Sequence, residues 1–229
     1  MNDTAALLDC IERETGPTPA WAVIWLHGLG ADGHDFVPLV PELVRPGWPA
    51  IRFLFPHAPV RAVTINNGTR MRAWYDIVDF DLANRADETG VLESVAQVDA
   101  LIARESARGI PASRVILAGF SQGGAVALQL LRRDPHALRF VVNLSGFPFP
   151  AAMQGDTALA EVRPPALWGH GGMDPLYDPE REQAVREFMS AHTTLEEERR
   201  PQLGHAVDEI ELRAVAAFLQ RRAADADGR

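Results

Sequence analysis

The chain has 229 residues, of which 47% are hydrophobic, and it carries a formal net charge of −9 at pH 7. This length suits one large domain or two small ones, and no Pro/Ser/Gly-rich linker divides it. We therefore expect one domain over residues 1–229, with residues 223–229 forming a frayed tail. The negative charge makes nucleic acid and anionic membrane surfaces poor partners.

The first residues and the cysteine content predict a cytoplasmic protein. No basic segment followed by an apolar one opens the chain, so we expect no signal peptide. Apolar runs such as Trp21–Leu26 are too short to span a bilayer, so no stable membrane insertion is expected. A single cysteine, Cys10, excludes an internal disulfide and fits a reducing compartment.

Short apolar runs alternate with helical patterns along the chain. Continuous apolar runs suit strands that are covered on both faces, and they occur at 21–26, 51–55, 115–118, 140–144 and 166–168. Helices are predicted at 35–43, 88–106, 121–133, 179–191 and 207–222. The alternation predicts an α/β fold with a mostly parallel sheet and helices on both faces.

Three segments do not fit this alternation. The first dozen residues are compatible with a strand or with a short helix. Residues 56–87 have little periodicity and are too long for a plain connection, so we predict a functional loop there. Residues 146–161, with several prolines, are predicted as a second such loop.

Gly119-Phe-Ser-Gln-Gly123 lies between a predicted strand and a predicted helix. Gly-x-Ser-x-Gly in this context is typical of a nucleophile elbow, in which the serine sits on a strained turn at the top of a sheet. Glycines are needed because the backbone on either side of the serine is crowded. We predict Ser121 as a nucleophile; a serine that only caps the helix is the alternative.

A catalytic serine needs a base and a carboxylate, which follow it in the chain order Ser, Asp or Glu, His on this kind of sheet. Five of the seven histidines are unsuitable because they precede the serine or suit a turn or a helix end: His27, His34, His57, His136 and His192. His170 and His205 remain. His205 lies in a Gly-His loop between the strand-like segment 193–199 and the last helix, so we predict it as the base.

The acid is expected in the loop after the strand at 166–168, where Asp174 is the first carboxylate. Asp178 is the alternative, although it resembles the start of a helix, where acids are stabilising. His170 and Asp174 also suggest a metal pair, but no third ligand has matching spacing. We expect neither a metal nor another cofactor.

Backbone N–H groups are expected to stabilise the oxyanion of the reaction. One donor in such sites is the residue after the nucleophile, here Gln122, and the other comes from an early strand-to-helix loop. His27-Gly-Leu-Gly30 follows the first core strand, and its glycines allow close approach to a substrate. We predict the Leu29 N–H as the second donor.

The same early loop also supports a different class of function. Gly28-Leu-Gly-Ala-Asp-Gly33 matches Gly-x-Gly-x-x-Gly, the fingerprint of NAD-binding oxidoreductases. That hypothesis requires an acidic residue about 20 positions later, but Phe53–His57 contains none. A non-catalytic binding protein is a third hypothesis, which the presence of all three triad residues disfavours.

The motifs together resemble the phospholipase/carboxylesterase family, the acyl-protein thioesterase-like branch of the α/β-hydrolases. The motifs are His27–Asp32, Trp74–Ile77, Gly119–Ala125, the loop containing Asp174, and Gly204-His205. The likeness extends from about Trp21 to the last helix. It implies an α/β-hydrolase fold without a large cap, and cleavage of carboxylic esters of short to medium acyl chains. Some members cleave thioesters on lipidated proteins, or lysophospholipids.

By this resemblance, Ser121, Asp174 and His205 take the triad roles, and Leu29 and Gln122 the oxyanion roles. The implied enzyme is a serine carboxylesterase that works through an acyl-enzyme. An acyl-protein thioesterase or a lysophospholipase is the alternative. The implied partners are a small-molecule ester or thioester, or an acylated protein, for a monomer or homodimer.

Three further residues are assigned through the resemblance. Trp74 matches a family aromatic beside the acyl pocket, with hydrophobic anchoring of its loop as the alternative. Leu176 follows a proline in a loop that departs from the family pattern, and it can still line the pocket. Phe149 replaces a family leucine, and its bulk is expected to narrow or redirect the acyl channel.

Overall fold

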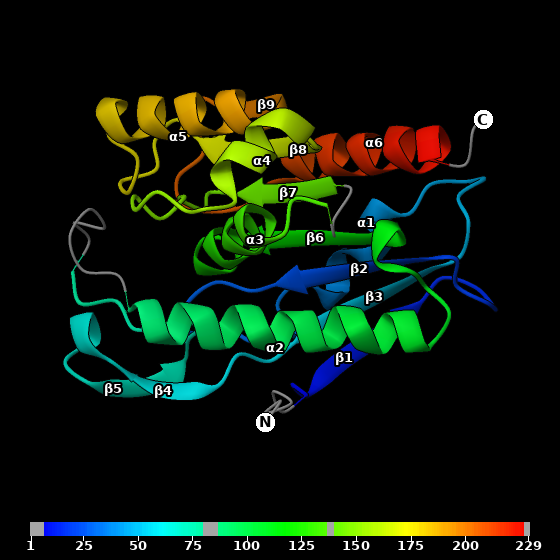
Figure 1. Cartoon of the computed structure of the whole chain (residues 1–229), viewed down its shortest axis with the longest axis horizontal. Coiled ribbons are helices and arrows are strands. Elements are labelled where there is room, and N and C mark those ends of the chain that lie inside the picture. Colours follow the sequence, from blue (N-terminus) through cyan, green and yellow to red (C-terminus); the bar gives the residue numbers. More distant parts are fainter. Residues whose placement is uncertain (1–6, 80–86, 137–139, 227–229) are drawn as a thin grey trace.

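The computed structural model describes residues 7–79, 87–136 and 140–226 (Figure 1). The main sheet consists of β1 (Cys10–Glu14), β2 (Trp21–Leu26), β3 (Ile51–Pro56), β6 (Val115–Phe120), β7 (Phe140–Leu144), β8 (Pro165–Gly171) and β9 (Thr194–Arg200). The helices are α1 (Val40–Leu43), α2 (Glu88–Ala107), α3 (Gln122–Arg133), α4 (Asp156–Val162), α5 (Pro179–His192) and α6 (Glu209–Ala226). The strand order is β1-β3-β2-β6-β7-β8-β9, and among these described strands only β1 pairs in the antiparallel direction.

Helices cover both faces of the sheet, as the alternation of elements predicts. On β2, Ala22, Ile24 and Leu26 face a core built with α2, α3 and α5. The intervening Trp21, Val23 and Trp25 face a second core built with α6. Because both faces are covered, all six residues of β2 are buried, which explains its uninterrupted apolar sequence.

The chain changes direction across the sheet between β2 and β6, which are neighbours. After β2 it continues to β3 on one side, and after β6 it continues to β7 on the other. The loops that leave the carboxyl ends of β2 and β6 therefore diverge and open a crevice between them. These carboxyl ends point to the left in Figure 1.

The two segments predicted as loops contain secondary structure. Residues 56–87 include the hairpin of β4 (Val60–Val63) and β5 (Thr69–Arg72), which lies at the lower left of Figure 1. Its turn uses Asn67 and Gly68, which have φ angles of 55° and 73°. Such angles favour Asn and Gly. Residues 146–161 contain most of α4, which begins at Asp156.

The two ends of the chain and the first helix also differ from the sequence predictions. Of the ambiguous first dozen residues, the last three belong to the edge strand β1, and residues 1–6 lie outside the described part of the chain. The helix predicted at 35–43 is replaced by a 3-10 turn at Val37–Leu39 followed by the short helix α1. Pro38 and Pro41 each lie in the first turn of one of these elements, and neither has the N–H that a longer, continuous helix would need. Helix α6 continues to Ala226 and Ala223 packs in the core, so the predicted tail at 223–229 does not begin at 223; residues 227–229 lie outside the described part of the chain.

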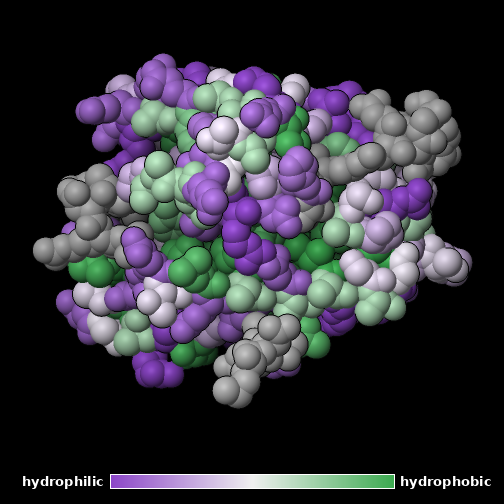
Figure 2. Space-filling view, viewed as in Figure 1, coloured by the Kyte–Doolittle hydropathy of each residue, from purple (hydrophilic) through white to green (hydrophobic). Residues whose placement is uncertain are grey.

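The surface in Figure 2 mixes hydrophilic and hydrophobic residues, and hydrophilic residues gather along α5 at its upper left. This distribution follows from the sequence of α5, which has buried residues only at Val185 and Met189. In the described part of the chain, no helix has the length and apolar character needed to cross a membrane.

Candidate active site

Ser121 occupies the sharp turn between β6 and α3. Its backbone has φ 55° and ψ −118°, a combination that residues with side chains rarely adopt. The surrounding chain holds this conformation, because the Ser121 N–H donates to Leu144 O at 2.7 Å and the Ala125 N–H donates to Ser121 O at 3.1 Å. Strain that is fixed by neighbouring hydrogen bonds is a frequent property of functional residues.

The glycines of the Gly-x-Ser-x-Gly motif allow this turn to form. A Cβ on Gly119 would overlap the backbone of Gly123. A Cβ on Gly123 would overlap the carbonyl oxygen of Leu26 at the end of β2. The start of α3 therefore packs directly on the backbone of two strands, which is the crowding that the sequence analysis anticipated.

Replacing Gly123 with alanine is expected to lower the free energy of unfolding by about 2–3 kcal/mol, because the added methyl group meets backbone that cannot move aside. Gly204→Ala is a suitable control, since a Cβ there meets nothing within 4 Å. Urea unfolding of both variants measures the difference. Equal stability of the two variants would contradict the packing described for the elbow.

Ser121, His205 and Asp174 form one hydrogen-bonded chain. His205 Nε2 lies 2.8 Å from Ser121 Oγ, and His205 Nδ1 lies 2.6 Å from Asp174 Oδ2. The Asp174 side chain is fully buried, whereas the His205 side chain keeps 23% of its surface exposed. The Phe120 ring lies 4.9 Å from the imidazole, centroid to centroid, and covers one side of it.

The two acid candidates have different positions. Besides contacting His205, Asp174 accepts a hydrogen bond from the Leu176 N–H at 2.9 Å through its other oxygen. Asp178 is the N-cap of α5 and accepts from the Arg181 N–H at 2.7 Å. Asp178 thus satisfies a free donor of the helix, as its position in the sequence suggested.

The loop after β2 lies against the elbow. A Cβ on Gly28 would lie 3.1 Å from Cδ1 of Phe120, which is a tight contact, and 3.5 Å from the Cβ of Ser121, so glycine lets this loop approach the Phe120 ring closely. The buried His27 fixes the loop, with Nδ1 2.7 Å from Gly28 O and Nε2 accepting from the Ala58 N–H at 3.1 Å. Burial lowers the pKa of His27, which keeps the ring neutral for these two bonds.

Leu29 and Gln122 line the cavity that contains Ser121. Leu29 follows Gly28 directly in this loop and lines the same cavity as Ser121. Gln122 is the first residue of α3, so its N–H has no acceptor within the helix. The structure therefore brings the two residues that are predicted to supply the oxyanion donors to the same cavity as Ser121.

The Gln122 side chain has a role that the sequence analysis did not predict. Its Oε1 accepts from the Trp74 N–H at 2.8 Å, and its Nε2 donates to Tyr75 O at 2.7 Å. These bonds tie the segment after the β4–β5 hairpin to the elbow. The only available signal was the polar residue inside Gly-x-Ser-x-Gly, whose distant partners the sequence does not reveal.

A cavity of about 410 Å³ opens beside Ser121 and His205. Leu176 lines it, as expected. Trp74 does not; it is completely buried, and its indole N–H donates to His27 O at 2.8 Å. The prediction of Trp74 as a pocket aromatic is thus corrected to an anchoring role. Tyr75, the next residue, lines the cavity in its place.

Phe149 also lies elsewhere than expected. It lines a neighbouring cavity of about 590 Å³, together with Phe188 and Arg132, and contacts Tyr75 edge-on at 5.2 Å between ring centroids. Phe147 and Arg181 line both cavities and separate them. Phe147, rather than Phe149, therefore limits the cavity beside Ser121.

The alternative cofactor and metal hypotheses fit the geometry poorly. No helix begins at Gly33, as a dinucleotide site requires, since α1 begins at Val40. Gly33 instead packs against the backbone of Phe55, which a Cβ would overlap. The His170 ring stacks on Trp168, with 3.9 Å between the ring centroids. Its Nε2 forms a structural hydrogen bond with Glu197 Oε1 at 3.0 Å, rather than a metal pair with Asp174.

Comparison with known proteins agrees with the fold and the geometry of this site. Residues 11–222 match the sequence profile of the phospholipase/carboxylesterase family. The chain belongs to this family. It is therefore an enzyme of the carboxylesterase and acyl-thioesterase-like serine hydrolases, as its motifs indicated.

Individual relatives support the same assignment. The chain is 35% identical to carboxylesterase SOBER1 of Arabidopsis thaliana over 204 residues, 87% of this chain and 90% of the relative. It is 37% identical to acyl-protein thioesterase 1 of Cryptococcus neoformans over 172 residues, 73% and 71% of the two chains. The crystal structure of SOBER1 superposes with a TM-score of 0.77 at 33% identity, covering 88% of this chain and 98% of that one. The α/β-hydrolase fold without a large cap is thereby confirmed.

Proposed function

We propose that this enzyme cleaves carboxylic esters of short to medium acyl chains through an acyl-enzyme on Ser121. The observation that carries the proposal is the chain of hydrogen bonds from Ser121 Oγ through His205 to Asp174, at 2.8 and 2.6 Å. A serine with an imidazole and a buried carboxylate in this order is the constellation of acyl-transfer enzymes.

The distances support a separate role for each side chain. His205 Nε2 takes the Ser121 proton as Oγ attacks the ester carbonyl, and it then gives that proton to the leaving alcohol. Asp174 accepts from the Nδ1–H of His205, which fixes the tautomer and stabilises the imidazolium. Water then reaches the acyl-enzyme, loses a proton to His205 and releases the acid, which restores Ser121.

The carbonyl oxygen becomes negative when Ser121 attacks the ester and again when water attacks the acyl-enzyme. The N–H groups of Leu29 and Gln122 are the proposed donors to it, and the N-terminus of α3 adds its positive end. Removing one such donor costs about 10²–10³-fold in kcat in serine hydrolases. Both donors belong to backbone that tight packing holds in place, so little reorganisation is needed during the reaction.

The cavity size and lining support short to medium acyl chains. Its volume of about 410 Å³ lies near the lower end of ligand sites, and apolar side chains such as Tyr75, Ile77 and Leu176 line it. Each methylene that enters such a lining is worth about 0.8 kcal/mol, or roughly fourfold in kcat/KM. The gain stops when the chain reaches Phe147, which separates this cavity from the next.

A series of p-nitrophenyl esters of increasing acyl length tests this limit. We expect kcat/KM to rise with the first methylenes and to fall for long acyl chains. The matching thioesters, measured with wild type and Ser121→Ala, separate ester from thioester preference. A maximum at long chains would contradict the proposed specificity.

A second candidate is a deacylase for lipidated proteins or lysophospholipids, and the neighbouring cavity favours it. That cavity, of about 590 Å³, shares Phe147 and Arg181 with the site, so a long acyl chain that displaces Phe147 can continue into it. One relative is named acyl-protein thioesterase 1.

For either function, the proposed enzyme is cytoplasmic, is a monomer or homodimer, and acts on a small ester or thioester or on an acylated protein.

A further inference from the structure

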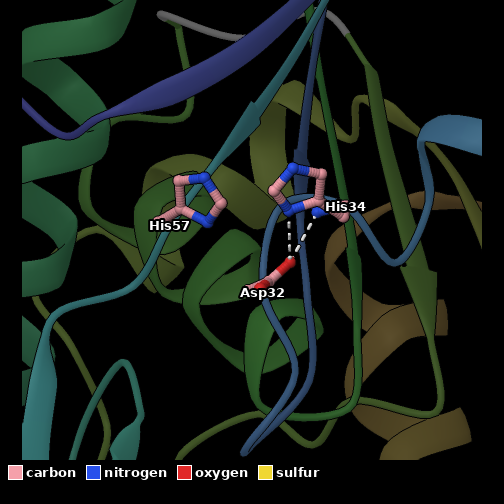
Figure 3. A group of neighbouring side chains, drawn as sticks. All are labelled: Asp32, His34 and His57. Carbon is pink, nitrogen blue, oxygen red and sulfur yellow. Dashed lines mark hydrogen bonds and ion pairs between the residues drawn. The ribbon is translucent and has the colours of Figure 1, made fainter.

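Asp32, His34 and His57 gather beside the active site without taking part in the proposed reaction (Figure 3). Asp32 and His34 come from the loop after β2, and His57 directly follows β3. One ring nitrogen from each histidine and one carboxylate oxygen lie within 4.8 Å of one another. Three potential ligands from two separate segments thus face a common point.

The backbone holds these side chains in place. Asp32 Oδ1 accepts from the His34 N–H at 2.7 Å and lies 3.0 Å from His34 Nδ1. His57 Nδ1 accepts from the Gly33 N–H at 3.1 Å, and the two imidazole centroids are 5.4 Å apart. Since His57 Nδ1 acts as an acceptor, it already presents the lone pair that a cation requires, with the Gly33 N–H as its competitor.

The charge of Asp32 is not neutralised by a nearby basic side chain. Among the described residues, its ion pair is with His34 alone. A second cluster of the same kind, His170, Glu182 and Glu197, differs, because Arg186 Nη2 lies 2.7 Å from both carboxylates and supplies the positive charge. The first cluster therefore has room for a cation where the second holds a guanidinium.

Accessibility and ligand chemistry define which cation fits. The side chains of His34 and Asp32 are 73% and 43% exposed, so an ion reaches them from solvent and can keep water ligands. Two imidazoles and one carboxylate suit late first-row cations such as Zn²⁺ and discriminate against Mg²⁺ and Ca²⁺. Arg72 is a basic side chain close to His57, but its Nη1 donates to Ala58 O at 2.8 Å, and within the described part of the chain it forms no ion pair with Asp32.

We propose that Asp32, His34 and His57 form a surface site for Zn²⁺ or a cation of similar preference. The bound ion would link the loop after β2 to the end of β3. This loop carries Leu29, three residues before Asp32, so occupation of the site restrains the backbone that follows a proposed oxyanion donor. Competition with the Gly33 N–H lowers the affinity of the site for the cation.

Calorimetric titration of the metal-free full chain with Zn²⁺ tests the site, with Mg²⁺ in parallel. We expect one Zn²⁺ per chain, no Mg²⁺ binding, and a rise in Tm of several degrees at saturating Zn²⁺. His34→Ala should weaken Zn²⁺ binding at least about tenfold, since even loss of a supporting residue has this effect at metal sites. Its ester hydrolysis in metal-free buffer should equal that of wild type, which verifies its folding.

His136→Ala is the matched control, because His136 is another exposed histidine, placed in a different loop. It should bind Zn²⁺ as wild type does, and so should Cys10→Ser, which removes the one thiol. Unchanged affinity in His34→Ala, an equal loss in His136→Ala, or no stoichiometric Zn²⁺ binding by wild type would each overturn the proposal.

Discussion

Asp174→Asn is expected to lower kcat for ester hydrolysis by about 10⁴-fold with the fold intact. The asparagine Oδ1 can still accept the Leu176 N–H, so the loop keeps its conformation. Its amide group, however, cannot stabilise an imidazolium, and it favours the His205 tautomer with the proton on Nε2, where the base must be free. Steady-state kinetics on one p-nitrophenyl ester measures this loss.

Asp178→Asn is the matched control for Asp174. Asparagine is as good an N-cap as aspartate, so α5 should keep its first turn and the enzyme its activity. A large loss in Asp178→Asn together with a small one in Asp174→Asn would show that the acid of the reaction is Asp178.

Glu211→Gln is expected to stabilise the protein more strongly as the pH rises. The Glu211 side chain is fully buried in α6 against Gly169 of β8, and neither carboxylate oxygen has a hydrogen-bond partner among the described residues. Burial raises the pKa of Glu211 from its ordinary 4.5 to about 8, and the neighbouring Asp208 and Glu198 add to the shift while Arg200 opposes it. Near pH 7 the native side chain is therefore protonated.

The sign of the pH dependence follows from this raised pKa. Between about pH 4.5 and pH 8 the unfolded chain releases the Glu211 proton more readily than the native one, so the wild type loses stability as the pH rises through this window. Glutamine does not titrate. The advantage of Glu211→Gln should grow across the window to at most about 5 kcal/mol, at 1.36 kcal/mol per pKa unit, and then level off.

Urea unfolding of wild type and Glu211→Gln at a series of pH values measures this difference. Asp208, which pairs with Arg200 at 3.0 Å, is present in both proteins, so the comparison isolates the titration of Glu211 together with its coupling to Asp208. Parallel stability profiles between pH 4.5 and pH 8 would show that Glu211 titrates normally in the native state.

Local patterns predicted much of this molecule because the relevant residues are close in the sequence or ordered by the fold. The continuous apolar strands predicted burial on both faces, and β2 has it. The glycines around Ser121 predicted crowding, which the contacts of Gly119 and Gly123 display. Chain order selected His205 and Asp174, because parallel strands bring their carboxyl ends to one edge.

Contacts between distant segments could not be predicted in the same way. Trp74 is aromatic and lies in a long loop, which suits a pocket as well as an anchor; its burial depends on His27, 47 residues earlier. The sequence alone does not predict the cluster of His34 and His57, because nothing along the chain indicates that the loop after β2 lies beside the end of β3. Their proximity arises from the pairing of β2 with β3.

The central claim is that Ser121 is the nucleophile, and covalent labelling tests it most directly. Wild type should react with a fluorophosphonate to one adduct per chain, located on Ser121 by mass spectrometry, and should lose its esterase activity in proportion. Ser121→Ala, which keeps His205 and Asp174, should neither be labelled nor hydrolyse esters. Persistent labelling or hydrolysis by Ser121→Ala would contradict the account.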